Sequence, residues 1–375
     1  MDNTFVPSKH QAAGHDGCLI SLGDNSIFAK LTNQQEIDFY NETQTLSQDD
    51  EDQLLGSKLV DWMPVFMGTL TQSDITKHDP NSVVMPVLNE DKKRVKQKLE
   101  GDDKSSEEVD DKQYIVLQNL YGGYVSPSIL DIKLGSKLYD ENATAEKAER
   151  LGKVSDSTTS GSLNFRICGM KLYNGNLTQT PAAEFDGMGE TMKLITDDED
   201  ANYIEFDKYF GRSLSKDNVT DGLALFFDQF ENAFIKRKLL ETFIKRLQLL
   251  YNCLLDTEVR IISGSLLFIV ENDMRKWEPV VDNDELYEAR DSLIRSDFID
   301  DDDDDDDEPG EVQSKQIADI DASLLSSLNF IDFAHAKYTK AKGYDENIIV
   351  GVENLITIFE TILNKCNTYL SKTRN

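Results

Sequence analysis

The segment 127–135 contains the residues whose types and spacing are best suited to chemistry, since it reads PSILDIKLG. Asp131 and Lys133 are two positions apart, so on an extended strand their side chains project to the same side. The acid can orient or deprotonate a hydroxyl group, while the lysine neutralises a phosphoryl group in transfer. An Asp-x-Lys pair by itself is usually a surface ion pair, and phosphoryl transfer therefore needs further partners.

A second acid, Asp332, stands directly after the apolar run 328–331 and is followed by Phe333. Magnesium in phosphoryl-transfer sites takes one or two carboxylates together with phosphate oxygens. An acid at the end of an apolar strand predicts such a ligand, as in kinase-like folds. The alternative is that Asp332 caps a following helix, which is a common role for aspartate.

The third candidate is a turn at residues 12–17, AAGHDG, followed by an apolar stretch that reaches Lys30. Small residues let a hairpin backbone approach phosphates, and Lys30 can reach those phosphates from the next strand. The Gly-x-x-x-x-Gly-Lys-Ser/Thr pattern of P-loops does not occur in the sequence. Glu36, six residues later, can orient Lys30 as the helix glutamate does in protein kinases; otherwise it is a solvated helix position.

Residues 133–171 form a mildly positive window, with seven Lys/Arg against five acids, in a chain of net charge −31. Residues 144–154 read as a short helix on which Lys147, Arg150 and Lys153 share a face, at spacing i, i+3, i+6. We expect an anionic small ligand to bind near this window. The alternative is an ordinary solvated helix face.

Strands and helices must position these residues, and the hydrophobic pattern predicts both. Runs rich in β-branched and apolar residues predict strands at 64–70, 113–120, 259–270 and 328–331. Amphipathic spacing predicts helices at 230–257 and 347–365. Strands are denser early in the chain and helices are denser late, which favours an α+β fold in two lobes.

Three polar segments are predicted to be insertions outside the core, at 71–112, 174–201 and 281–322. The last contains eight consecutive aspartates at 300–307, and residues 281–308 hold fifteen acids and two arginines. Such a run repels itself and cannot bury apolar surface, so we expect the segment 281–322 to be disordered and the other two segments to be flexible.

Composition excludes several classes of protein. A net charge of −31 argues against general nucleic-acid binding, because a phosphate backbone needs Lys and Arg. No run approaches the length of a membrane span, and the first residues do not read as a secretory signal. The four cysteines lie far apart without a Cys-x-x-Cys pair, which predicts scattered thiols in a reducing compartment rather than a zinc site or disulfides.

Together these segments resemble the inositol polyphosphate kinase family. The pattern Pro-x-x-x-Asp-x-Lys-x-Gly at 127–135 is the hallmark of that family, and further blocks similar to it occur in the family's order outside the three insertions. They are AGHDG at 13–17, WMP at 62–64, GSLNFRICGMK at 161–171, RIISGSLLF at 260–268, IDFAH at 331–335 and GYDEN at 343–347. The chain most resembles the fungal multikinases of this family, which are also similar to it in their acidic run before the Ile-Asp-Phe-Ala block.

The resemblance implies a two-lobed kinase-like fold with an antiparallel sheet in each lobe and ATP in the cleft between them. The N-terminal β-rich lobe is expected at 1–120 and the catalytic lobe at 121–375, with an inositol phosphate-binding segment at 140–171. The implied substrates are inositol 1,4,5-trisphosphate and tetrakisphosphates, converted towards the pentakisphosphate with ATP and Mg²⁺. An intracellular location, in the nucleus or the cytoplasm, is also implied.

For the nucleotide, the resemblance implies five residues. Lys30 matches the lysine that holds the ATP phosphates, and Gln118 and Leu120 match the hinge whose backbone meets adenine. Relatives often have Glu at the Gln118 position. Asp131 matches an acid close to the nucleotide and the reacting hydroxyl, and Asp332 matches the magnesium ligand.

For the transfer and the acceptor, Lys133 matches the catalytic lysine, and Ser265 falls in a Ser-Leu-Leu block near nucleotide and metal. His335 lies where relatives approach the inositol phosphate. The remaining residues that fall in the inositol-binding region are Lys147, Arg150, Lys153 and Lys171.

Two other functions are weighed against this one. A protein kinase would have a His-Arg-Asp-x-x-x-x-Asn catalytic loop and an Ala-Pro-Glu segment, and the sequence has neither. An interaction protein would use the run at 300–307 to contact basic transcription regulators or chromatin, alone or alongside kinase activity. Activity on free inositol phosphates rather than on peptides distinguishes an inositol phosphate kinase from a protein kinase. An interaction protein is distinguished by whether the effects of deleting 300–307 survive in a catalytically dead variant.

Overall fold

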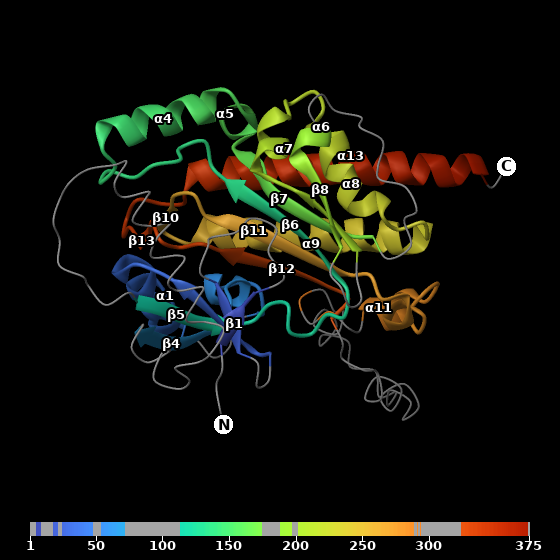
Figure 1. The fold of residues 1–375 in the computed structure, drawn as a ribbon, viewed down its shortest axis with the longest axis horizontal. Helices are drawn as coiled ribbons and strands as arrows, with labels where there is room; N and C mark the ends of the chain where they lie inside the picture. The colour runs from blue at the N-terminus through green and yellow to red at the C-terminus, as the bar shows by residue number, and fades with distance from the viewer. Residues whose placement is uncertain are drawn as a thin grey trace, which may run out of the picture.

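A computed structural model of the chain describes residues 5–8, 18–21, 25–47, 54–71, 113–174, 188–196, 202–288, 291, 293 and 324–373. These residues form a smaller N-terminal lobe and a larger C-terminal lobe that contains two long helices (Figure 1). The turn predicted at 12–17 and the acidic run predicted to be disordered at 300–307 lie outside the described residues.

The N-terminal lobe is built on an antiparallel five-stranded sheet in the order β1-β2-β3-β5-β4. The strands predicted at 64–70 and 113–120 are present as neighbours, with slightly different ends. The strands are β1 (Phe5–Pro7), β2 (Leu19–Ser21), β3 (Ile27–Leu31), β4 (Phe66–Thr71) and β5 (Gln113–Gln118), and the helices are α1 (Gln34–Ser47) and the 3₁₀ turn η1 (Leu59–Trp62).

Helix α1 joins the N-terminal lobe to the C-terminal lobe through aromatic packing. Its Phe39 ring stacks on Phe333 at 5.1 Å between centroids, and Tyr40 meets the same ring edge-on at 5.5 Å. Such contacts bury large apolar areas and prefer defined ring geometries. The middle of α1 is therefore held against the segment that follows Asp332.

The C-terminal lobe contains an antiparallel six-stranded sheet in the order β12-β11-β6-β7-β9-β8. Its central strand, β6, is buried along nearly its whole length, because neighbours on both sides and helices behind exclude water. The strands are β6 (Pro127–Leu134), β7 (Phe165–Tyr173), β8 (Met192–Thr196), β9 (Asn202–Phe206), β11 (Ser265–Glu271) and β12 (Ser326–Ile331).

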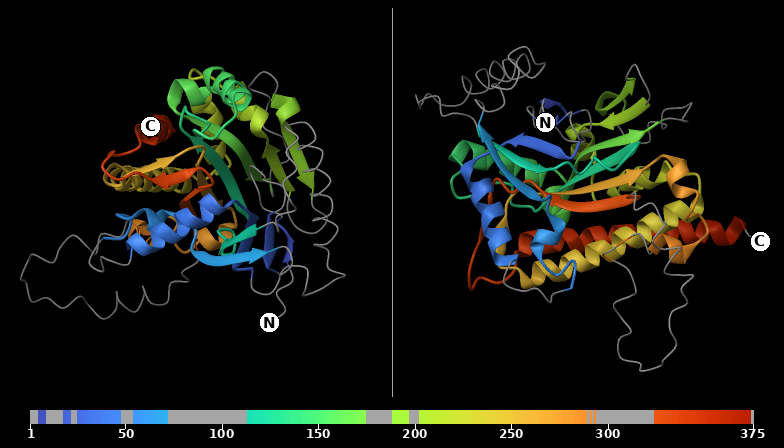
Figure 2. Two further views of the ribbon diagram at one scale, coloured as in Figure 1. Left: turned by 90° about the vertical axis from the view of Figure 1, so that its left-hand side faces the viewer. Right: turned by 90° about the horizontal axis from the view of Figure 1, so that it is seen from below.

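Two long helices lie side by side behind this sheet (Figures 1 and 2). The helix predicted at 230–257 is α9 (Ala233–Asp256), and it begins after Asn232, whose side chain accepts from the Phe234 N–H at 2.9 Å. The helix predicted at 347–365 is α13 (Glu346–Thr373), longer than expected. No described helix combines the length and apolarity needed to cross a membrane.

Shorter helices surround the sheet. The one predicted at 144–154 is present as α4 (Ala145–Asp156) and is capped by Thr144. The others are α5 (Thr159–Leu163), α6 (Met188–Thr191), α7 (Lys208–Ser213), α8 (Val219–Asp228), α10 (Met274–Trp277) and α11 (Asp284–Glu288).

The single strand predicted at 259–270 is wrong. The structure has β10 (Val259–Ile261), which pairs with β13 (Ala336–Tyr338) in a separate two-stranded sheet, and then β11 in the large sheet. Between them the backbone turns at Ser263, where φ is +61°. A left-handed residue cannot continue an extended strand, so the apolar run divides between two sheets.

Two of the predicted insertions contain ordered structure. The segment 174–201 includes β8, which pairs with β9, and the segment 281–322 begins with helix α11. In α11, Tyr287 is buried, stacks on Trp277 at 5.9 Å and shares a hydrogen bond with Thr242. The prediction of disorder over 281–322 is therefore wrong for α11, where a buried aromatic side chain holds an acidic segment against the core.

A buried carboxylate fixes the link between the lobes. Glu271, at the end of β11, is fully buried and accepts hydrogen bonds from the backbone N–H groups of Val125 and Ser126, at 2.7 and 2.9 Å. It also accepts from Asn272 and Asp273, each at 2.9 Å. These charge-assisted bonds hold the entry to β6 against β11.

Candidate active site

Strand register places residues from four strands in one row at one end of the large sheet, and two of them, Lys133 and Arg166, are charged. Lys133 on β6 lies opposite Ser265 on β11 and opposite Arg166 on β7, and Ser265 in turn lies opposite Ile331 on β12. Asp332 follows Ile331 directly. Facing residues on neighbouring strands project to the same side of a sheet, so the row presents the two cations together, and Asp332 follows at its β12 end.

Asp131 lies two residues before Lys133, on the same face, as predicted from the spacing. It is only 5% exposed, and its Oδ1 has no hydrogen-bond partner among the described residues. Burial, reinforced by the negative charge of Asp332, raises the pKa of Asp131 to about 7, although Lys133 and Arg166 act in the opposite direction. A carboxyl group that titrates near neutral pH can accept a proton from a hydroxyl during catalysis.

Lys30 and Asp332 meet across the two lobes. The Nζ of Lys30 lies 2.7 Å from Asp332 Oδ1 and 2.9 Å from Glu36 Oε1. Burial alone would lower the pKa of Lys30, but the two carboxylates outweigh it and hold the pKa above its ordinary value. The predicted contact between Lys30 and Glu36 is confirmed, and Glu36 also accepts from the Phe333 N–H at 3.0 Å.

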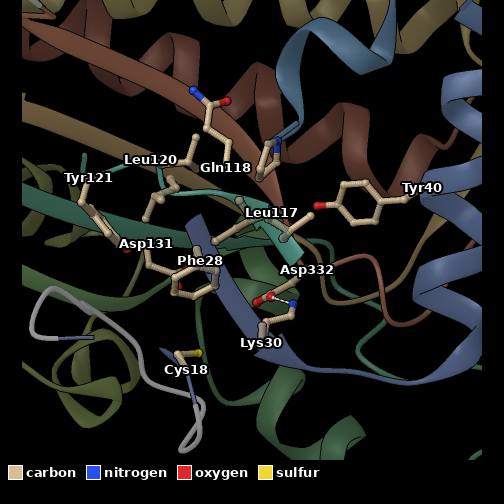
Figure 3. Close-up of a pocket in the computed structure, with 13 residues that line it drawn as sticks. Cys18, Phe28, Lys30, Tyr40, Leu117, Gln118, Leu120, Tyr121, Asp131 and Asp332 are labelled. Carbon is tan, nitrogen blue, oxygen red and sulfur yellow. Dashed lines mark hydrogen bonds and ion pairs between the residues drawn. The ribbon is translucent and has the colours of Figure 1, made fainter. Parts of the chain in front are cut away.

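Asp332 does not cap a helix, the alternative weighed from the sequence. Its backbone has φ of +67°, a left-handed conformation that turns the chain away from β12, and no helix follows before β13. The turn aims its side chain at the N-terminal lobe, where it meets Lys30 (Figure 3).

A cavity of about 690 Å³, including its open mouth, lies beside this pair. Most of its lining is apolar, from Phe28, Leu117 and Leu120 among others, while Lys30 and Asp332 meet at one end (Figure 3). An apolar slot with charges at one end suits a flat heterocycle that carries phosphates.

Gln118 and Leu120, the predicted hinge residues, both line the cavity. The Gln118 amide points away from the labelled charged groups (Figure 3), so any contact with a bound base would come from backbone. The backbone N–H of Gln118 already donates to the Val65 carbonyl at 2.9 Å.

Lys133 and Arg166 are cations without acidic partners among the described residues. Lys133 donates to the Ser263 carbonyl at 2.6 Å. Arg166 is 6% exposed, donates to the hydroxyl groups of Ser160 and Thr158 at 3.2 and 3.5 Å, and has an Nε with no partner. Buried charges are normally paired, so a buried arginine that forms no ion pair among the described residues, next to the half-buried Lys133, forms a place for an anion.

Arg166 was not among the residues singled out from the sequence, although it lies in the positive window. Alternation along a regular strand would put it on the opposite face from Lys171. A bulge in β7 reverses this, because Asp131 pairs with Gly169 while Ile132 pairs with Ile167, which leaves Cys168 as an extra residue. No pattern in the sequence marks that bulge.

The remaining predicted acceptor residues do not all join the row. His335 lies three residues after Asp332, and its side chain is 36% exposed. Its Nδ1 lies 2.7 Å from Asp140 Oδ2. Lys171 is buried at the far end of β7, opposite Ile129, with its ammonium 4.6 Å above the Tyr203 ring.

On α4, Lys147 and Arg150 are exposed, as a binding face requires. Lys153 is also exposed but pairs with Glu149 at 2.6 Å. The structure thus brings eight predicted residues to one region of the molecule, and leaves the α4 face and Lys171 outside the row. The eight are Lys30, Gln118, Leu120, Asp131, Lys133, Ser265, Asp332 and His335.

The donor set is compatible with a magnesium ion held mainly by a nucleotide. The described residues contain no group of three or more His, Cys, Asp or Glu side chains placed to hold a metal. Asp332 provides one carboxylate at the cavity, which is within the one or two that Mg²⁺ takes when phosphates supply the other ligands.

Comparison with known proteins agrees with this geometry. The family model for inositol polyphosphate kinase matches residues 114–360. The chain is 40% identical over 368 residues, 95% of its own length and 98% of the relative's, to an inositol polyphosphate multikinase of Saccharomyces cerevisiae. It is also 27% identical to the inositol polyphosphate multikinase of Schizosaccharomyces pombe. That match extends over 353 residues, 94% of this chain and 96% of the relative.

Among solved structures, the chain resembles the S. cerevisiae inositol phosphate multikinase crystallised with ADP and Mn²⁺. The TM-score is 0.60 and the identity 37%, over 90% of this chain and 99% of the other. The two-lobed α+β fold expected from the sequence is thereby confirmed. An interaction role for residues 300–307 finds no support in these comparisons. The sequence, the fold and the row of charges agree, and this chain belongs to the inositol polyphosphate kinase family.

Proposed function

We propose that this chain transfers the γ-phosphoryl group of ATP to a hydroxyl group of an inositol polyphosphate. The observation that carries the proposal is the row that holds Lys133 and Arg166, with Asp332 at its β12 end beside the apolar cavity and Asp131 on the same face as Lys133. In a chain of net charge −31, two cations that form no ion pair with an acid among the described residues, close to this cavity, favour a small, highly charged acceptor over a peptide.

The nucleotide lies in the cavity with its base between apolar side chains such as Phe28 and Leu267 and its phosphates towards Lys30. Lys30 then exchanges one of its two carboxylate partners for phosphate oxygens, and Glu36 keeps its ammonium in place. Asp332, released from Lys30, becomes available as a metal ligand. Bound Mg²⁺ would neutralise charge on the phosphates during transfer.

The acceptor hydroxyl lies near Asp131 and Lys133. Its oxygen attacks the γ-phosphorus, its proton passes to the Asp131 carboxylate, and the bond to the β–γ bridging oxygen breaks as ADP leaves. Lys133 faces the charge that develops on the transferring group. Arg166 holds an acceptor phosphate, together with His335 and the α4 residues Lys147, Arg150 and Lys153.

The acceptors proposed are inositol 1,4,5-trisphosphate and tetrakisphosphates, converted towards the pentakisphosphate. Support comes from the 40% identical S. cerevisiae relative, which is named a multikinase. A nuclear or cytoplasmic location and the binding of basic regulators by residues 300–307 stay proposals from the sequence, as do the lobe boundaries 1–120 and 121–375.

The test is incubation of the purified chain with ATP, Mg²⁺ and a panel of inositol phosphates, with the product isomers resolved. Lys133→Ala should abolish turnover, because it removes the cation that faces the transferring group. Lys137→Ala is the matched control, since Lys137 is an exposed lysine four residues later. Phosphorylation of peptides in place of inositol phosphates would refute the proposal, and so would full turnover by the folded Lys133→Ala variant.

A further inference from the structure

The ring of His335 has a fixed partner that no sequence pattern indicated. Its Nδ1 lies 2.7 Å from Oδ2 of Asp140, and among the described residues the ring makes no second hydrogen bond. The carboxylate is 10% exposed, whereas the His335 side chain is 36% exposed. Asp140 therefore lies behind the ring, and the rest of the imidazole faces solvent.

The chemistry of the two groups decides which ring nitrogen is free. An ionised carboxylate only accepts hydrogen bonds, so Nδ1 must carry the hydrogen in this contact. This holds for the neutral and for the charged imidazole. Nε2 is then the nitrogen that remains for a ligand, since the bond made by one ring nitrogen sets the role of the other.

Asp140 is itself held in place before it meets His335. Its second oxygen, Oδ1, accepts from the Asn142 N–H at 3.1 Å, which closes a local turn. Two residues earlier, the Leu138 carbonyl accepts from the Ser263 hydroxyl at 3.2 Å, and the Ser263 carbonyl accepts from Lys133 at 2.6 Å. Two hydrogen bonds and a short stretch of backbone thus link Asp140 to Lys133.

The backbone of His335 is fixed as well, because its carbonyl accepts from the Ile262 N–H at 3.2 Å. One residue after Asp140, Glu141 forms an ion pair with Lys337 on β13. That pair is exposed on both sides and shares no hydrogen bond with the imidazole among the described residues, so it ties the same two segments together without orienting the ring.

We propose that Asp140 is a positioning residue, which holds His335 with Nδ1–H towards itself and leaves Nε2 available to the inositol phosphate acceptor. The proposal rests on the proposed function, because it assigns the acceptor as the ligand of Nε2. Asp140 touches neither substrate, and it acts only through the imidazole. The segment before α4 thereby takes an indirect part in acceptor binding, through His335.

The kinetic test is a double-mutant cycle on the full chain. Asp140→Ala and His335→Ala should each raise KM for inositol trisphosphate roughly tenfold, and the double variant should be no worse than His335→Ala alone. KM for ATP should change less than about twofold in all three. Glu141→Ala, the matched control, should behave as wild type. Additive effects in the double variant, or an equal loss in Glu141→Ala, would overturn the proposal.

A milder substitution separates orientation from charge. Asp140→Asn keeps an acceptor oxygen for Nδ1–H but has no charge, so it should lose clearly less than Asp140→Ala. An equal loss would show that the negative charge acts rather than the orientation of the ring, which contradicts a positioning role.

A spectroscopic readout stands apart from catalysis. Nitrogen-15 NMR of the imidazole groups, with the His335 signals assigned by their absence in His335→Ala, should show a hydrogen-bonded Nδ1–H that disappears in Asp140→Ala. A wild-type His335 whose neutral ring carries its hydrogen on Nε2 would refute the arrangement. If wild type phosphorylates no inositol phosphate but the NMR result holds, the proposed function fails while the Asp140–His335 geometry stands.

Discussion

Replacing Asp131 by Asn should stabilise the ligand-free protein above neutral pH while abolishing phosphoryl transfer. Burial and the nearby charge of Asp332 raise the pKa of Asp131 from 3.8 to about 7. One pKa unit corresponds to about 1.4 kcal/mol, so ionising this carboxyl in the folded state costs up to about 4 kcal/mol. The Asn side chain is neutral at every pH and avoids that cost.

The direction in which the free energy of unfolding changes with pH follows from proton binding. The folded protein holds the Asp131 proton more tightly than the unfolded chain does, so this group's contribution to stability is greatest below about pH 4 and is lost as the pH rises to about 7. The difference in unfolding free energy between Asp131→Asn and wild type should therefore grow from pH 5 to pH 8. A gain of about 1–4 kcal/mol at pH 8 is expected, with the upper figure as a limit.

The assay is urea unfolding of both proteins at pH 5, 6, 7 and 8, without nucleotide or metal, followed by turnover measurements with both substrates. Asp217→Asn, at an exposed position, controls for the loss of one negative charge from a chain of net charge −31. The reasoning would be refuted if the difference between Asp131→Asn and wild type were the same at pH 5 and pH 8, or matched that of the control.

Three further predictions concern the metal, the acceptor face and the acidic run. Asp332→Asn should lower kcat about 10³-fold or more, roughly 4 kcal/mol, and near-normal turnover of the folded variant would remove Asp332 from the mechanism. Lys147→Ala and Arg150→Ala should mainly raise KM for the inositol phosphate, because each loses a contact that contributes about 1.5–3 kcal/mol to binding, and the effect should be smaller at high salt. An unchanged KM at low salt would show that the α4 face is only solvated surface. Deleting residues 300–307 should leave turnover and Tm nearly unchanged, and a loss of cooperative unfolding would contradict the assignment of that run as an insertion.

Local chemistry was readable from the sequence alone. The two-residue spacing places Asp131 and Lys133 on one face, because side chains alternate along any extended strand. Helical periodicity predicted both ends of α9 and the N-terminal end of α13 to within a few residues. Only the C-terminal end of α13 lies further along the chain than predicted. The contact between Lys30 and Glu36 was also predicted, since it spans only a strand end and the first turn of a helix.

Only the tertiary structure decided which distant residues meet. The row of Lys133, Ser265 and Arg166 depends on hydrogen-bond register between strands that are far apart in the sequence, and a bulge at Cys168 changes the face on which Arg166 lies. The division of 259–270 between two sheets likewise depends on a turn at Ser263 that its apolar composition does not reveal.

The pairing of Asp140 with His335 is the clearest case, because 195 positions separate two residues whose hydrogen bond is 2.7 Å long. Sequence patterns record the periods of single elements, since these follow from the backbone geometry of a helix or a strand. Contacts between elements follow instead from how the whole core packs and which polar groups it must satisfy. That is why the acid and the lysine of this site were predictable from the chain, whereas the arginine beside them and the acid behind the histidine were not.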